Sequence, residues 1–109
     1  MSWEVLFYKN TRGDNPVEIF IKNQQPQTGV KIASAIDALE ENGPFISPQF
    51  SKKLDSNIYE LRITGKIQVR ILYTIIGGVF VLLHAFKKKT NKVPFREIKT
   101  AIARRNEIL

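Results

Sequence analysis

The residues best suited to chemistry are one carboxylate and a set of basic side chains between residues 52 and 92. Alternation of apolar and polar residues in the strand-like run 67–73 places Arg70 on the polar side. A turn before this run folds the preceding segment alongside it, which puts Glu60 and Arg62 on the same face. We therefore expect one face of a sheet to carry a carboxylate and two guanidinium groups, with lysines at its end.

These side chain types are suited to RNA cleavage in which the 2′-hydroxyl attacks the adjacent phosphate. The reaction needs a positioned backbone, a proton acceptor and stabilisation of a doubly anionic phosphorane. A guanidinium binds two phosphate oxygens at once but stays protonated, so Glu60 or a lysine must take the proton. Alternatively, Glu60 and Arg70 form an ordinary cross-strand ion pair. The candidate catalytic residues are Arg70, Arg62, Lys88 and Glu60.

Two turn signals set the expected register of three strands. Gly77-Gly78 is a two-residue hairpin loop, because both positions can adopt positive φ, and residues 64–66 form a turn with a left-handed glycine. In this register Arg70 lies opposite Glu60 on one side and opposite Ala85 on the other, where the small side chain leaves room for a phosphate. A bulge would exchange the faces of a strand. The other face then carries the core: Tyr59, Leu61, Ile63, Val69, Ile71, Tyr73, Leu82, His84 and Phe86.

The composition excludes several kinds of site. The chain has 109 residues, no cysteine and one histidine, which excludes a disulfide scaffold, a zinc site and a cysteine nucleophile. His84 lies within an apolar run and is interpreted as a hydrogen-bonded structural residue. No metal or other cofactor is expected. Residues 1–109 are expected to form a single domain in the cytoplasm, since no run reaches membrane-spanning length and no signal-peptide pattern is present.

The net charge of +7 is unevenly distributed along the chain. Residues 1–50 hold 4 basic and 6 acidic residues, whereas residues 51–109 hold 13 basic and 4 acidic residues. A basic half of this kind suits a polyanion, with nucleic acid favoured over membrane lipid, although a solvated basic surface is the simpler alternative. The candidate RNA-binding residues are Lys52, Lys53, Phe86, Lys87, Lys89 and Lys92.

The remaining elements follow from local signals. A strand is expected over residues 3–8, and a helix begins after Asn15, a capping residue followed by proline, and stops near Gln25. A second helix covers 27–42, and a terminal helix follows Pro94. The predicted fold is α+β, in the order β-α-α-β-β-β-α: an N-terminal strand, a two-helix hairpin on one sheet face, a three-stranded antiparallel meander and a C-terminal helix.

The segments YELRI, VRILY and HAFKKKTNKVP, at these spacings, carry a family resemblance. The chain resembles the RelE/HigB superfamily of toxins from toxin–antitoxin pairs, and in particular the phage-derived HigB-like branch. The resemblance covers Lys53 to about Arg104 and implies a RelE-like fold. By position, Arg70 and Arg62 match basic strand residues of the family site, and the basic and aromatic residues after the last strand match Phe86, Lys87 and Lys88.

The resemblance implies a ribosome-dependent endoribonuclease, an mRNA interferase that inhibits translation and is held inactive by an antitoxin. Its partners would be the ribosome, mRNA and a cognate, helix-turn-helix antitoxin whose acidic segment covers the basic face, in a heterotetramer. The chain lacks an obvious His–Tyr or Glu–His acid–base pair near its C-terminal edge, which leaves the lysines as candidate acids. The competing interpretation is a non-catalytic RNA- or ribosome-binding module, either a degenerate toxin or a phage host-takeover factor.

Overall fold

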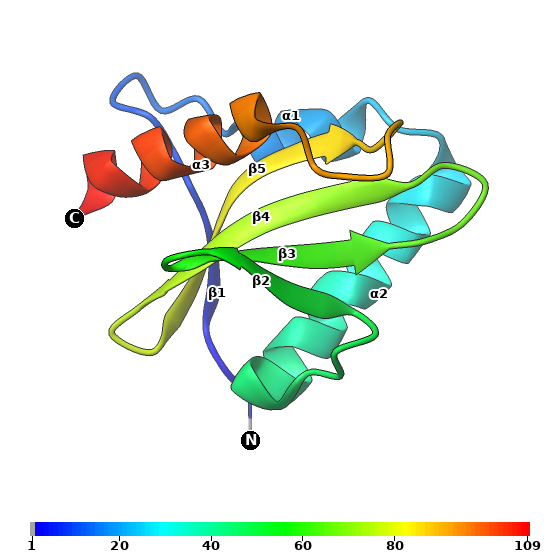
Figure 1. The fold of residues 1–109 in the computed structure, drawn as a ribbon, viewed down its shortest axis with the longest axis horizontal. Coiled ribbons are helices and arrows are strands. Elements are labelled where there is room, and N and C mark those ends of the chain that lie inside the picture. The colour runs from blue at the N-terminus through cyan, green and yellow to red at the C-terminus, as the bar shows by residue number, and fades with distance from the viewer. Residues whose placement is uncertain (1) are drawn as a thin grey trace.

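The computed structural model describes residues 2–109 and has the predicted α+β architecture (Figure 1). One five-stranded sheet has the strand order β1-β5-β4-β3-β2. Strands β2 to β5 pair antiparallel, whereas β1 pairs in parallel with β5 at the sheet edge. The elements are β1 (Val5–Phe7), α1 (Pro16–Lys22), α2 (Pro26–Asn42), a 3-10 turn (Gly43–Phe45), β2 (Ser51–Asp55), β3 (Ile58–Ile63), β4 (Val69–Ile76), β5 (Val79–Lys87) and α3 (Phe95–Ile108).

The helix boundaries follow local capping chemistry. The Asn15 side chain accepts a hydrogen bond from the Glu18 backbone N–H at 3.1 Å, as expected of an N-cap. Helix α1 ends at Lys22, earlier than predicted, and Pro26 occupies the first position of α2, where a proline is favoured. Gly43 closes α2 with φ of 52°, and a Cβ there would clash with the Trp3 ring, so this cap requires glycine.

The two predicted turns have different outcomes. Gly77 and Gly78 have φ values of 56° and 80° and join β4 to β5, which confirms the two-residue loop. The prediction of a turn over residues 64–66 is wrong, because residues 64–68 connect β3 to β4 and Gly65 does not have a positive φ. Arg62 therefore lies opposite Arg70. The shift is two residues, so the faces predicted for β3 and β4 are preserved.

A β-bulge changes the register between β4 and β5. Leu72 pairs with His84, but Tyr73 pairs with Leu82, so Leu83 is an extra residue on β5. Beyond the bulge the faces of β5 are exchanged. Arg70 therefore lies opposite Phe86 and not Ala85. The predictions that His84 and Phe86 face the α1–α2 core, and that Lys87 shares the face of Arg70, were wrong for this reason.

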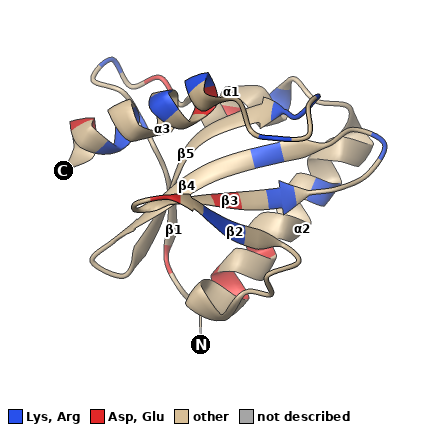
Figure 2. Ribbon diagram, viewed as in Figure 1, with Lys and Arg blue, Asp and Glu red and all other residues tan. Residues whose placement is uncertain are grey.

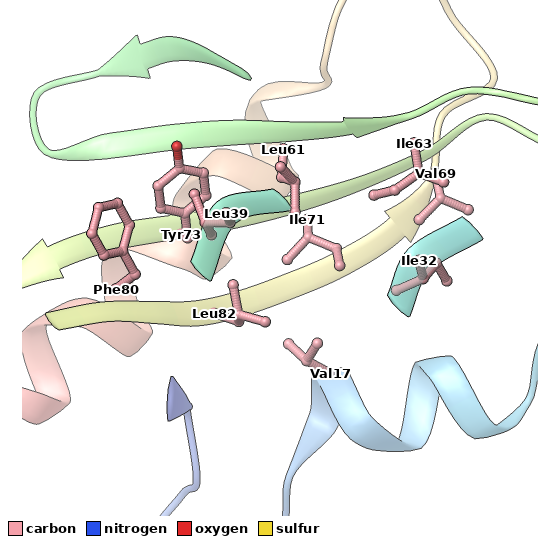
Figure 3. Close-up of a cluster of buried hydrophobic side chains, with 10 residues drawn as sticks. All are labelled: Val17, Ile32, Leu39, Leu61, Ile63, Val69, Ile71, Tyr73, Phe80 and Leu82. Atoms are coloured by element: carbon pink, nitrogen blue, oxygen red, sulfur yellow. The ribbon is translucent and has the colours of Figure 1, made fainter. Parts of the chain in front are cut away.

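The sheet separates two apolar clusters. Helices α1 and α2 cover one face, where the cluster consists of Val17, Ile32, Leu39, Leu61, Ile63, Val69, Ile71, Tyr73, Phe80 and Leu82 (Figure 3). Helix α3 covers the other face, where the buried members are Tyr8, Ile58, Leu72, Val81, Leu83, Phe86 and Ala101. Within residues 2–109, no helix combines the length and apolar character needed to cross a bilayer.

Candidate functional site

A buried carboxylate lies at the centre of the candidate site. The Glu60 side chain is only 3% exposed, and its Oε1 accepts a hydrogen bond from Arg62 Nε at 2.9 Å. Its other oxygen, Oε2, lies 3.3 Å from Arg70 Nε. The three side chains meet because Glu60 and Arg62 are two residues apart on β3, and Arg70 lies opposite Arg62 on β4. The predicted carboxylate with two guanidinium groups is therefore formed.

Arg70 is directed into the protein. Its side chain is 8% exposed, and its Nη1 donates to the Val69 carbonyl at 2.9 Å and to Gln68 Oε1 at 3.4 Å. The Nε atom makes no hydrogen bond, so its contact with Glu60 is an ion pair without hydrogen-bond alignment. Burial lowers the pKa of the Arg70 guanidinium, while the charge of Glu60 opposes that shift. Phe86, and not the small Ala85 expected to leave room for a phosphate, lies opposite Arg70.

A cleft of about 260 Å³ opens beside this carboxylate. It brings together five of the predicted site residues, Lys52, Glu60, Arg62, Lys88 and Lys92. The other lining residues are Leu54, Asn91, Val93 and Ile98. Figure 2 shows, on the ribbon, basic segments of β2, β3 and the β5–α3 loop near an acidic segment of β3. Hence the cleft forms where β2, β3, this loop and α3 meet.

The β5–α3 loop is held in place by backbone contacts. The Lys88 backbone N–H donates to the Gln68 carbonyl at 2.8 Å, which ties this loop to the β3–β4 connection. Farther along the loop, Thr90 Oγ1 donates to the Lys92 carbonyl at 2.6 Å. These two bonds fix the backbone that presents Lys88 and Lys92 to the cleft.

The remaining predicted residues do not line the cleft. Phe86 is buried in the α3-side cluster, so its ring is not available to RNA as predicted. Lys53 points elsewhere, with its Nζ 6.0 Å from the centroid of the Tyr59 ring. Lys87 and Lys89 are exposed outside the cleft lining.

The structure also forms a Glu–His pair that sequence reasoning missed. His84 Nε2 lies 2.8 Å from Glu97 Oε1, and Arg104 Nη1 lies 3.2 Å from His84 Nδ1. Because Arg104 can only donate, Nδ1 is the acceptor and Nε2 donates to Glu97. Burial lowers the pKa of His84, and the hydrogen bond to Glu97 opposes that shift. The prediction of a hydrogen-bonded His84 is confirmed.

This pair fastens α3 to β5 and does not line the cleft. Arg104 also donates to the Leu83 carbonyl at 2.8 Å, so one side chain contacts both the bulge and the histidine. The signal that could have revealed the pair is Glu97 in the first turn of the terminal helix, 13 residues after His84. Among residues 2–109, no group of three or more His, Asp or Glu side chains could hold a metal ion.

Comparison with known families now places the chain. Residues 19–106 match a family model described as phage-derived protein Gp49-like (DUF891). The chain belongs to the Gp49-like family. A search of curated proteins found no match. The matched range includes every residue that lines the cleft, so the site of this Gp49-like protein lies wholly within the family domain.

The lining of the cleft in the Gp49-like protein carries an excess of positive charge. Its lining holds four cations, Lys52, Arg62, Lys88 and Lys92, against the single carboxylate of Glu60. Arg62 is the accessible guanidinium, with 31% of its side chain exposed. Glu60 is enclosed and accepts the hydrogen bond from Arg62 Nε, so the carboxylate fixes the orientation of the Arg62 guanidinium at the cleft.

Proposed function

We propose that this Gp49-like protein is the toxin of a toxin–antitoxin pair, and that it is a ribosome-dependent endoribonuclease that inhibits translation. Its family is associated with toxins of the RelE/HigB type, which supports the first part. The observation that carries the second part is the cleft, in which four cations surround one buried carboxylate. Such an arrangement suits a phosphodiester, whose charge increases on the way to the phosphorane.

The proposed reaction uses the cleft residues in distinct roles. The 2′-oxygen forms a bond to phosphorus and loses its proton, while the bond from phosphorus to the 5′-oxygen breaks and that oxygen gains a proton. Arg62 contacts the phosphorane oxygens through its planar fork. Glu60 and Arg70 act as positioning residues, because both are enclosed and Glu60 contacts both guanidinium groups. Proton transfer falls to the lysines that line the cleft, among them Lys88, whose own backbone N–H is anchored to the Gln68 carbonyl.

An acidic segment of a cognate antitoxin is the proposed inhibitor. The basic side chains of the cleft repel one another when the cleft is uncovered. An acidic segment that binds over them is therefore favoured by charge complementarity. We expect the product of the neighbouring reading frame to co-purify at near-stoichiometric yield. Recovery of a non-toxic, partner-free protein from normally growing cells would contradict this part of the proposal.

The test of the endoribonuclease begins with induction of the protein alone and together with its neighbouring gene, scored by growth and translation. Purified protein is then measured in single-turnover cleavage on ribosomes programmed with mRNA. Arg62→Ala should slow cleavage by about two to three orders of magnitude, as for loss of one transition-state donor. Arg62→Lys should rescue only partly, since an ammonium group lacks the bidentate fork.

The matched control is Lys9→Ala, which removes an exposed cation just after β1, at the edge of the sheet opposite β2. This variant should cleave at the wild-type rate. Full cleavage by a well-folded Arg62→Ala protein would remove Arg62 from the reaction. Tight ribosome binding without any cleavage by the wild type would favour the non-catalytic binding module.

A further inference from the structure

A second hollow lies on the other side of Arg62. This groove has a volume of about 350 Å³ and runs between α2 and the end of β3. Its walls are largely apolar, with Val30, Ala35 and Ala38 from α2 facing Phe50, and Lys31 and Arg62 add positive charge. Arg62 lines both the groove and the cleft.

Phe50 is an aromatic ring left partly in water beside the site. It is 45% exposed, just before β2 begins. Its carbonyl accepts a hydrogen bond from the Arg62 backbone N–H at 2.8 Å. The backbone that carries the ring is therefore fixed beside the backbone of Arg62, the residue whose guanidinium is proposed to hold the reacting phosphate.

We propose that this groove is a subsite for one unpaired base of the RNA strand, stacked on Phe50, next to the phosphate bound at Arg62. This proposal rests on the proposed function, because it assumes that the cleft holds a phosphodiester. An apolar wall with an aromatic ring suits the face of a base, and flanking cations suit the backbone on either side of it. Lys31, which also lines the groove, is assigned to the next phosphate.

The observations favour an RNA strand over a partner peptide. The groove and the cleft share Arg62 as a lining residue, and both linings carry positive charge, which suits successive phosphates of one polynucleotide strand. Stacking is also tolerant of base identity, because every base presents a π-face. A single exposed phenylalanine therefore sets the position of the strand without restricting its sequence.

The test measures the energetic coupling between Phe50 and each base. The ligand is a short single-stranded RNA with a 2′-deoxy residue at the scissile position, prepared intact and with one abasic site at each position in turn. Affinities are measured by fluorescence anisotropy at fixed salt for the wild type and for Phe50→Leu, Phe50→Trp and Phe45→Leu. Phe45 is the matched control, being 79% exposed and packed against Trp3 away from the groove.

One abasic position should weaken binding to the wild type by about 5- to 150-fold, the range for loss of one stacked base. Phe50→Leu should remove that position-specific penalty, whereas Phe50→Trp and Phe45→Leu should retain it. Melting curves show whether each variant is folded. Equal affinity of the wild type for intact and abasic strands, including no measurable affinity, overturns the proposal. A penalty for the abasic position that is the same in Phe50→Leu as in the wild type also overturns it. The proposal is overturned as well if Phe50→Leu leaves RNA affinity unchanged and only reduces the amount of an acidic protein partner that co-purifies.

The binding assay needs no cleavage, so the two proposals fail separately. Coupling between Phe50 and a base, with no cleavage on programmed ribosomes, would leave the subsite in place and remove the endoribonuclease. Arg62-dependent cleavage without such coupling would leave the endoribonuclease in place and remove the subsite.

Discussion

The two faces of the sheet are stabilised in different ways. The α1–α2 face is packed with apolar side chains, including Leu39, Ile71 and Leu82, and no charged residue belongs to its cluster. The α3 face has its own apolar cluster, but it also carries Glu60, Arg70 and Thr74, the buried polar residues found within 2–109. The first face is held mainly by burial, with a hydrogen bond between Tyr73 and Ser51 at 2.6 Å, whereas the second depends on several specific partners.

Helix α3 is attached accordingly. Tyr8 donates to Glu107 at 2.9 Å and Arg105 Nε donates to Thr74 Oγ1 at 3.0 Å, in addition to the His84–Glu97 contact. Such bonds fix direction better than apolar contact does, because a donor and an acceptor must be aligned. The face that must hold Arg62 in one orientation is therefore the face built from directional contacts.

The largest expected effect on stability comes from removing the buried carboxylate of the α3 face, which we call the polar face. Glu60→Ala leaves the Arg70 guanidinium buried without its counter-charge, and such a loss typically destabilises by about 3–5 kcal/mol. Urea unfolding monitored by circular dichroism measures the change. As a control, Glu18→Ala removes an exposed pair with Lys22 and should change stability by at most about 1 kcal/mol. A Glu60→Ala protein of wild-type stability would contradict the assigned ion pair.

Replacing both members of the pair sharpens the same comparison. Glu60→Leu combined with Arg70→Met removes both charges and keeps the volume apolar, which is often neutral or stabilising. Stability should recover relative to Glu60→Ala, while cleavage stays low because Arg62 has lost the carboxylate that orients it. A double variant as unstable as the single one would show that the unpaired charge is not the cause.

An intermediate effect is expected on the apolar face. Ile71→Val deletes one methylene next to Arg70 in the chain but on the α1–α2 side, and should destabilise by about 0.5–1.5 kcal/mol. Because the site lies across the sheet, the rate of cleavage on programmed ribosomes should not change. A loss of cleavage comparable to that of Arg62→Ala would mean that the two faces are not independent.

A smaller effect concerns salt dependence of RNA binding. Each lysine that contacts a phosphate releases counterions, so Lys88→Ala or Lys92→Ala should reduce the slope of log affinity against log salt by about 1. Lys9→Ala should leave the slope unchanged. Affinity measured by anisotropy over a salt series checks this expectation. A wild-type affinity that does not depend on salt would contradict phosphate binding in the cleft.

Local patterns predicted most of the fold but not the features set by register. The Asn15 cap, the Gly77-Gly78 hairpin and the order of helices and strands each depend on a few adjacent residues. Strand β2 was missed because its sequence, SKKLD, has one apolar residue and two lysines, as suits an exposed edge. The bulge at Leu83 was missed because a continuous apolar run gives no alternation to follow.

The site was predictable to the same degree. Glu60 and Arg62 are two residues apart on β3 and therefore share a face, and alternation on β4 places Arg70 on that face too. A register shift by an even number of residues does not change this. The enclosure of Arg70, the contact of Glu97 with His84 and the groove at Phe50 all depend on how helices pack against the sheet. Apart from the position of Glu97 in the first turn of the terminal helix, no spacing within the sequence carries that information.

The smallest expected effect comes from His84, where the polar face titrates. Burial lowers the pKa of His84 in the folded protein, whereas an unfolded histidine titrates near about 6.5. Between these two pKa values the unfolded chain binds more protons than the folded one. Stability should therefore rise with pH through this window and be lost as the pH falls below about 6.5. The difference in protons bound between the unfolded and folded states is at most one, which keeps the effect small.

His84→Gln tests this, because the chain has no other histidine and no cysteine to titrate in the same range. Urea midpoints between about pH 5 and 8 should fall less steeply on acidification for the variant than for the wild type. Glu97→Gln removes the group that opposes the shift, so the folded pKa falls further and the window should extend to lower pH. Identical pH profiles for the wild type and His84→Gln would show that His84 does not couple to folding.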